Sequence, residues 1–144
     1  NATRPWQHVL EPLSGYLALG ADLSMSYDSV GESFNFGPRS EQNRSVLELI
    51  TDLSKLWHFK KTDQAYRVTG DTSFDEASLL KLNCDKALHL LKWQSNWDYL
   101  ECINLVSEWY YNYYRLNTNI FNMTFNQIEK YEAKAKEKRL SWAC

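Results

Sequence analysis

The placement of the glycines constrains the fold of this 144-residue chain more than any other feature. Its five glycines stand at positions 15, 20, 31, 37 and 70, and no three of them form GxGxxG or GxxGxxG. A doubly wound nucleotide-binding domain needs such a Gly-rich strand-to-helix turn, because the backbone there must approach a pyrophosphate at the helix N-terminus. A complete domain of that type is therefore not expected from this chain.

Helical patterns alternate with short extended runs along the chain. Apolar residues at helical spacing predict helices over 12–23, 46–58, 85–91, 97–116 and 124–139, of which 97–116 is the longest. Ser45 with Glu48, and Thr124 with Gln127, have the spacing of a capping box. Short strands are predicted over 33–36, 66–69 and 78–82. The pattern indicates a single α/β domain over residues 1–144, mostly helical with a few short strands.

The run from Arg4 to Leu13 joins an extended segment to a helix start. Pro5 biases Arg4 away from helical conformation, and the pair Glu11-Pro12 is typical of the entry and first turn of a helix. We therefore expect Arg4 at a strand-like edge with a helix behind it. Its planar guanidinium suits a phosphate group, and an ion pair with a surface carboxylate is the alternative interpretation.

Composition excludes several classes of function. The net charge of −2 gives no general attraction to nucleic acid, and no apolar run reaches the roughly 20 residues of a membrane span. Cys84, Cys102 and Cys144 lack metal-ligand spacing, which favours free thiols in a reducing, cytoplasmic compartment. The histidines are isolated, so no metal site is predicted. The aromatic run over 109–114 could stack on bases, but packing against a neighbouring element is favoured because its rings spread around a helix.

Six segments, taken in chain order, carry a resemblance to a known family. They are RPWQHVLEPLSGYL from Arg4, Phe34 to Pro38, Glu76-Ala77 with Leu80 to Lys86 and Ala87, Leu91 to Trp93, Glu108 to Tyr110, and Thr124 to Tyr131. Together they resemble the C-terminal, substrate-binding part of CDP-glucose 4,6-dehydratases, which are extended short-chain dehydrogenase/reductases. The resemblance covers nearly the whole chain.

The resemblance implies an activity and separate roles for two domains. The family binds a CDP-sugar beside NAD, oxidises C4 of the hexose, eliminates water across C5 and C6, and returns the hydride to C6. The resemblance also implies that an N-terminal Rossmann domain, outside this chain, binds NAD and that the full-length enzyme is a homo-oligomer. No tyrosine here has a lysine four residues later, so neither catalytic nor cofactor-binding residues are expected within 1–144. Arg4 is the leading candidate for substrate binding, with Glu76 and Asn35 as further candidates.

The chain also departs from the family pattern. Phe74-Asp75 stands where members often have Pro-His, and Asn83 stands where aspartate is usual. Two alternatives therefore stay open. One is another nucleotide-sugar epimerase or dehydratase of the same superfamily, and the other is a helical interaction module without catalysis.

Overall fold

The computed structural model describes residues 2–68 and 79–143. Its helices are α1 (Leu10–Met25), α2 (Val46–Leu56), α3 (Asp85–Leu91), α4 (Tyr99–Tyr111) and α5 (Phe121–Glu137), and its strands are β1 (Thr3–Arg4) and β2 (Arg44–Ser45). The two strands form one antiparallel sheet. The protein is thus mostly helical with two short strands, as the sequence predicted, and the described residues hold no full Rossmann core.

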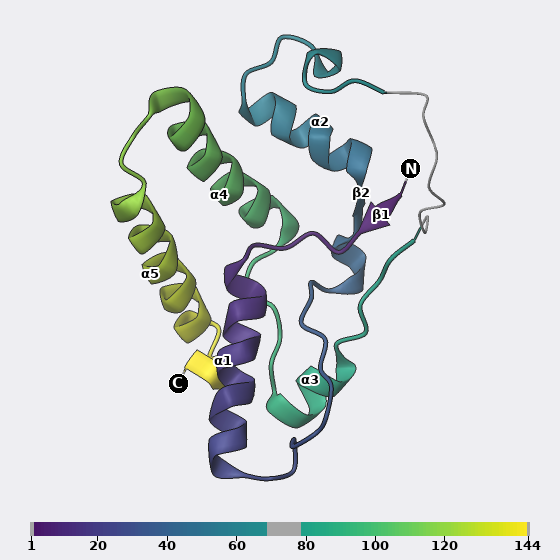
Figure 1. Ribbon diagram of the computed structural model, residues 1–144, viewed down its shortest axis with the longest axis vertical. Helices are drawn as coiled ribbons and strands as arrows, with labels where there is room; N and C mark the ends of the chain where they lie inside the picture. The colour runs from purple at the N-terminus through teal and green to yellow at the C-terminus, as the bar shows by residue number, and fades with distance from the viewer. Residues whose placement is uncertain (1, 69–78, 144) are drawn as a thin grey trace.

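The helices surround the N-terminal segment. Figure 1 shows α4 and α5 as a hairpin on one side of α1, α2 beside α4, and α3 beside the lower half of α1; contacts join α1 to α3, α2 to α4, and α4 to α5. The buried side chains form two clusters, one around Phe36, Ala87 and Trp93 and the other around Trp97, Cys102 and Tyr131. Trp142 packs against both clusters, so the C-terminal residues join them.

Local capping signals explain where two helices begin. The Glu48 carboxylate accepts from the Ser45 backbone N–H at 2.7 Å, and the Ser45 hydroxyl accepts from the Glu48 N–H at 3.1 Å, which confirms the predicted capping box. Asp98 and Glu101 form a second capping box at the start of α4, which sequence reasoning missed. α3 has the predicted bounds, and α1 begins two residues before the predicted Pro12.

The predicted strands are mostly wrong. Residues 33–36 form no strand, because no described strand lies alongside to complete a ladder; instead Phe36 is buried and its carbonyl accepts from the Gln7 amide at 3.0 Å. Residues 66–68 are also irregular, and Thr69 lies outside the described residues. Of 78–82, only Leu79 forms an isolated bridge, to Thr3, and Ser78 is not among the described residues.

The second half of the chain differs from prediction at two helix ends. α4 is α-helical only to Tyr111 and continues as a π-helix over Asn112–Leu116, so α5, with 17 residues, is longer than α4, with 13. The capping box predicted at Thr124 is wrong. Thr124 lies inside α5, where its hydroxyl donates to the Ile120 carbonyl at 2.9 Å and accepts from the Trp109 indole at 2.8 Å.

The aromatic run over 109–114 packs partly on itself. Trp109 stacks on Tyr113 and Tyr110 stacks on Tyr114, with centroids 5.5 and 6.0 Å apart. Tyr111 meets Trp57, which follows α2, edge to face at 5.7 Å, so the prediction of packing against a neighbouring element is confirmed for this ring.

Two glycines of α1 offer a matched test of packing. A Cβ atom at Gly15 would lie 2.3 Å from Cδ1 of the buried Phe36 ring, whereas a Cβ atom at Gly20 would meet nothing within 4 Å. We expect Gly15→Ala to lower the free energy of unfolding by about 1–3 kcal/mol through overpacking. Gly20→Ala should raise it by about 0.5–1 kcal/mol, because alanine favours the helix. Urea denaturation of both variants checks this, and effects of the same sign would contradict the close approach.

Candidate functional site

Arg4 lies in the two-stranded ladder ahead of α1. It stands opposite Arg44 of β2, with Thr3 opposite Ser45. The Arg4 side chain is half-buried, and one of its guanidinium nitrogens donates to the Thr3 carbonyl at 2.8 Å. The predicted strand-like edge before a helix is thus confirmed, while binding of a ligand by Arg4 stays a prediction.

The segment between β1 and α1 is held at three points. The Trp6 indole donates to the Arg44 carbonyl at 3.0 Å, and the Gln7 amide donates to the Phe36 carbonyl at 3.0 Å. The buried His8 ring meets Trp97 edge to face, with centroids 4.9 Å apart. Arg4 is therefore presented from backbone that is fixed on both sides of the ladder.

The other predicted site residues are not brought to this ladder. Asn35 is exposed, and its amide donates to the Asn83 carbonyl at 3.2 Å, just before α3. Asn83 in turn accepts from the Asp85 N–H at 2.8 Å, which begins that helix. Glu76 lies outside the described residues, so the structure does not test its predicted contact with substrate.

Two polar atoms near Arg4 are buried without a hydrogen-bond partner. They are Nδ2 of Asn43, the residue before β2, and Oγ1 of Thr3. A buried polar atom without a partner is unfavourable, because it loses its hydrogen bonds to water without replacement. The ladder therefore carries two buried, unsatisfied polar atoms besides the polar groups of Arg4. The sequence marked Asn43 only as the start of an Asn-Arg-Ser sequon and gave no signal for its burial beside Arg4.

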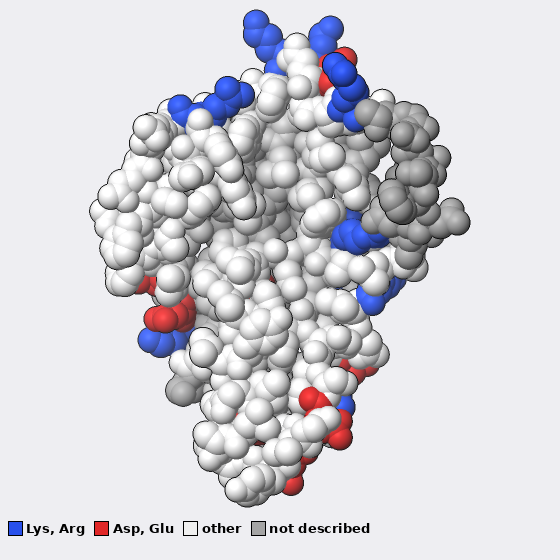
Figure 2. All heavy atoms as spheres, viewed as in Figure 1, with Lys and Arg blue, Asp and Glu red and all other residues white. Residues whose placement is uncertain are grey.

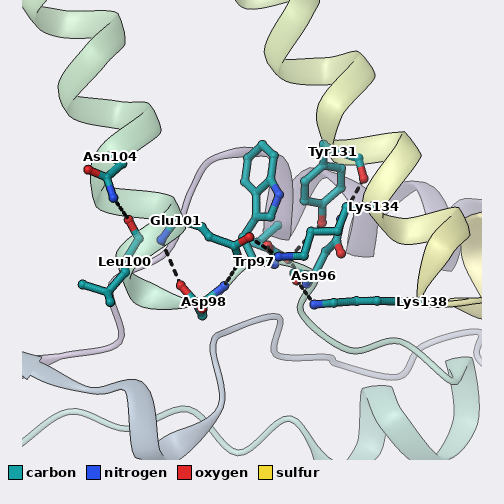
Figure 3. Close-up of polar contacts among 10 residues, drawn as sticks. Asn96, Trp97, Asp98, Leu100, Glu101, Asn104, Tyr131, Lys134 and Lys138 are labelled. Carbon is teal, nitrogen blue, oxygen red and sulfur yellow. Dashed lines mark hydrogen bonds and ion pairs between the residues drawn. The ribbon is translucent and has the colours of Figure 1, made fainter.

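A buried carboxylate lies at the start of α1. Glu11 is 1% exposed, and it accepts from the backbone N–H groups of Asn96 and Trp97 at 2.8 and 2.7 Å and from the Tyr131 hydroxyl at 2.9 Å. Figure 3 shows Asn96, Trp97 and Tyr131 meeting between α4 and α5. Glu11 thus joins α1 to the loop before α4 and to α5. Sequence reasoning treated Glu11 only as a helix-entry residue.

Further hydrogen bonds complete this network. Ser14 accepts from the Trp93 indole at 2.9 Å and bonds to the Tyr131 hydroxyl at 2.9 Å, and the Asn96 amide donates to the Tyr131 carbonyl at 2.7 Å. The Lys138 amine donates to the Asn96 carbonyl, and Lys134 pairs with Glu101 (Figure 3). The network connects three segments that are far apart in sequence.

Burial controls the protonation of these groups. It raises the pKa of Glu11, although its hydrogen bonds act in the opposite direction. Burial also raises the pKa of Tyr131, and the charge of Glu11 adds to that increase, so Tyr131 stays protonated and donates. Burial raises the pKa of the Cys102 thiol to about 12, which makes it inert as a nucleophile at neutral pH. The network is therefore suited to holding the fold rather than to proton transfer.

The described residues do not fit a metal ion or a dinucleotide. Across 2–68 and 79–143, no three His, Cys, Asp or Glu residues gather to hold a metal. Side chains of Phe36 and Leu82 occupy the space beside Gly15 and Gly37, and Gly31 lies in a turn, so none of these glycines forms a phosphate cradle. The helices in the same residues include none with the length and hydropathy of a membrane span.

Comparison with known proteins gives one informative match. No family model matches the chain. The CDP-glucose 4,6-dehydratase of Salmonella typhimurium is 36% identical to it over 107 residues, which is 74% of this chain. This similarity supports a relationship between this chain and the CDP-glucose 4,6-dehydratase family. The aligned stretch spans 29% of the length of the Salmonella dehydratase.

Proposed function

We propose that this chain is the nucleotide-sugar-binding lobe of a 4,6-dehydratase that acts on CDP-glucose. The observation that carries the proposal is the 36% identity to the Salmonella CDP-glucose 4,6-dehydratase over 107 residues. Because the alignment spans 29% of that protein, the catalytic residues and the NAD-binding domain are proposed to lie outside residues 1–144. The described residues, which form no dinucleotide cradle, are consistent with this division.

The role proposed for this lobe is to hold the substrate for a reaction completed elsewhere. NAD, held by the other domain, would supply the hydride acceptor and donor for oxidation at C4 of the hexose and reduction at C6, with water lost across C5 and C6. The lobe binds the diphosphate end of the substrate, and this remote binding energy orients the hexose and excludes water. Arg4, in β1, is the residue proposed for that contact.

Arg4 is the residue on which the proposed substrate binding is tested. Arg4→Ala should weaken binding of CDP by about tenfold to 150-fold, the equivalent of about 1.5–3 kcal/mol for hydrogen bonds to a charged group. Arg4→Lys should recover part of the loss, because a point charge lacks the planar fork. Calorimetric titration with CDP measures both variants.

An exposed arginine in the π-helical segment that follows α4 provides the control for Arg4. Arg115→Ala should leave the CDP affinity unchanged, because Arg115 lies over Trp57 and away from the ladder. Unchanged CDP affinity in a folded Arg4→Ala variant would remove the support for substrate binding at this lobe and return Arg4 to a structural role.

An apolar groove along α1 is proposed to receive the NAD-binding domain. Leu13, Leu17 and Met25 are 44%, 76% and 81% exposed, and they line a groove of about 840 Å³ whose other walls come from α3 and α5. A contiguous apolar surface of this kind is typical of an interaction site. Its position on α1, directly after the Arg4 segment, would bring the second domain close to the substrate.

The groove makes a prediction for this chain alone. The chain should bind a hydrophobic dye such as anilinonaphthalene sulfonate, and Leu17→Lys should lower the dye fluorescence at least twofold by placing a charge in the groove. Tyr27→Lys is the control, since Tyr27 is 90% exposed and lies in the loop after α1, outside the groove. A monomeric chain that binds no dye would argue against a docking face here.

A further inference from the structure

A pocket of about 410 Å³ lies between α2 and α4, apart from the β1–β2 ladder that holds Arg4. Its lining is mostly apolar, and three of the side chains in it are aromatic: Trp57, Phe59 and Tyr110. Ligand pockets in proteins have volumes of about 300–1,000 Å³ and are lined mainly by apolar and aromatic side chains with a few polar groups. The pocket between α2 and α4 therefore has the size and the lining of a small-molecule site.

Contacts between the two helices fix the walls of this pocket. Figure 1 shows α2 beside α4. The Tyr99 hydroxyl of α4 donates to the Asp52 carboxylate of α2 at 3.1 Å. Trp57, directly after α2, meets Tyr111 of α4 edge to face, with ring centroids 5.7 Å apart. Because these contacts set the separation of the helices, the pocket exists in the protein before any ligand binds.

Two buried serines, one from each helix, bring hydroxyl groups to the pocket. Ser54 of α2 and Ser107 of α4 are each 3% exposed and both line it. The Ser54 hydroxyl donates to the Thr51 carbonyl at 2.7 Å, so its oxygen can still accept a hydrogen bond. The Ser107 hydroxyl forms no hydrogen bond with any residue that the structure describes. Ser107 is therefore the polar group that is available to a ligand as acceptor or donor.

The lining favours a neutral ligand with few polar groups. Among the described residues, no charged side chain lines the pocket. Figure 2 shows uncharged atoms over the region where Figure 1 places α2 beside α4, with Lys and Arg side chains gathered above it. A charged or strongly polar group placed there would lose its hydration without a partner. The phosphates and the base of a nucleotide therefore do not suit this pocket, which is separate from the substrate contact proposed at Arg4.

We propose that the pocket between α2 and α4 binds a neutral aromatic molecule that carries one N–H or O–H group. Its ring packs against the aromatic side chains of Trp57, Phe59 and Tyr110, and its N–H or O–H group donates to the Ser107 hydroxyl. An apolar cavity of about 150 Å³ is enough to hold benzene, so this larger pocket has room for two fused rings. Binding there does not depend on the proposed function.

Indole is the probe that tests this site, and indene, which has the same shape without the N–H, is its matched partner. In calorimetric titrations, wild-type protein should bind indole about twofold to tenfold more tightly than indene, the range expected for one neutral hydrogen bond. Ser107→Ala should weaken indole binding by the same factor and leave indene binding unchanged. Ser24→Ala, at an exposed serine of α1, and Leu17→Lys, in the α1 groove, should both match wild type.

Nuclear magnetic resonance locates the bound probe. Indole should shift the backbone amide signals of Leu53 and Val106, which line the pocket. Shifts confined to α1, or loss of binding in Leu17→Lys, would place the probe in the α1 groove and overturn the proposal. Equal affinities of wild type for indole and indene, no binding of either, or equal losses for both in Ser107→Ala would overturn it too. Displacement of indole by CDP would contradict a site separate from the substrate, whereas undiminished CDP binding in saturating indole would support one.

Discussion

Glu11→Ala should lower the free energy of unfolding by about 2–5 kcal/mol, because a buried donor left without an acceptor costs about 1–3 kcal/mol. The substitution leaves two such donors, the backbone N–H groups of Asn96 and Trp97, whose acceptors are the Glu11 oxygens. The Tyr131 hydroxyl retains its bond to Ser14. Urea denaturation followed by tryptophan fluorescence measures the loss.

Two further variants define the origin of the Glu11 effect. Glu11→Gln keeps one acceptor oxygen and turns its NH₂ toward the second backbone N–H, so it should cost less than Glu11→Ala, about 1–3 kcal/mol. Glu129→Ala, at an exposed position of α5, should change stability by no more than about 0.5 kcal/mol. If Glu11→Ala lowered the free energy of unfolding as little as Glu129→Ala, the two backbone N–H groups would have to be satisfied by water.

The pH dependence of this effect has a defined sign. Burial raises the pKa of Glu11 in the folded protein above its ordinary value of 4.5. Its contribution to stability is therefore fully present below the ordinary pKa and is lost as the pH rises through the folded pKa. Because glutamine does not titrate, the stability difference between wild type and Glu11→Gln should narrow as the pH rises above 4.5. A difference that widens with pH would contradict the raised pKa.

Trp93→Ala should have the largest effect of any core truncation, about 3–5 kcal/mol. Trp93 is 1% exposed, its ring meets Phe36 edge to face at 5.0 Å, and its indole N–H donates to Ser14 at 2.9 Å. Truncation leaves a cavity in the Phe36 cluster and removes one contact of the Glu11 network. Guanidinium denaturation followed by circular dichroism measures this effect without relying on the lost tryptophan.

Trp109 is the matched control for Trp93. Its indole N–H also donates to a hydroxyl, that of Thr124 at 2.8 Å, but at the surface between α4 and α5. Trp109→Ala should therefore cost markedly less than Trp93→Ala, because the site opens to solvent rather than to a closed core. Equal losses for the two variants would mean that the α4–α5 contact, and not the Phe36 cluster, dominates stability.

Features that depend on neighbouring residues were predictable from the amino-acid sequence. Ser45 and Glu48 form the predicted capping box, α3 has the predicted bounds, and Pro5 keeps Arg4 in an extended segment before α1. Each rests on interactions within a few residues, which helix capping and backbone sterics determine. The mostly helical class followed from the same local patterns.

Other features needed tertiary partners that no local pattern reveals. Residues 33–36 have the composition of a strand, but a strand requires a second strand alongside, and the described residues provide none. Thr124 has the spacing of a helix cap, but α5 begins at Phe121 and the Thr124 hydroxyl bonds to Ile120 and Trp109 instead. In both cases packing overrode a local preference.

The candidate site also combines features set by local sequence with features set by tertiary packing. Local sequence was sufficient to put Arg4 at a strand edge, whereas strand register alone put Arg44 opposite it. The environment of Glu11 is also a tertiary result, because its hydrogen-bond donors lie 85, 86 and 120 residues away along the chain. Propensity acts over a few residues, while burial and register depend on which distant segments pack together. Local sequence therefore determines the helices. The pairing of Arg4 with Arg44 and the hydrogen bonds of Glu11 form only when distant segments of the chain pack together.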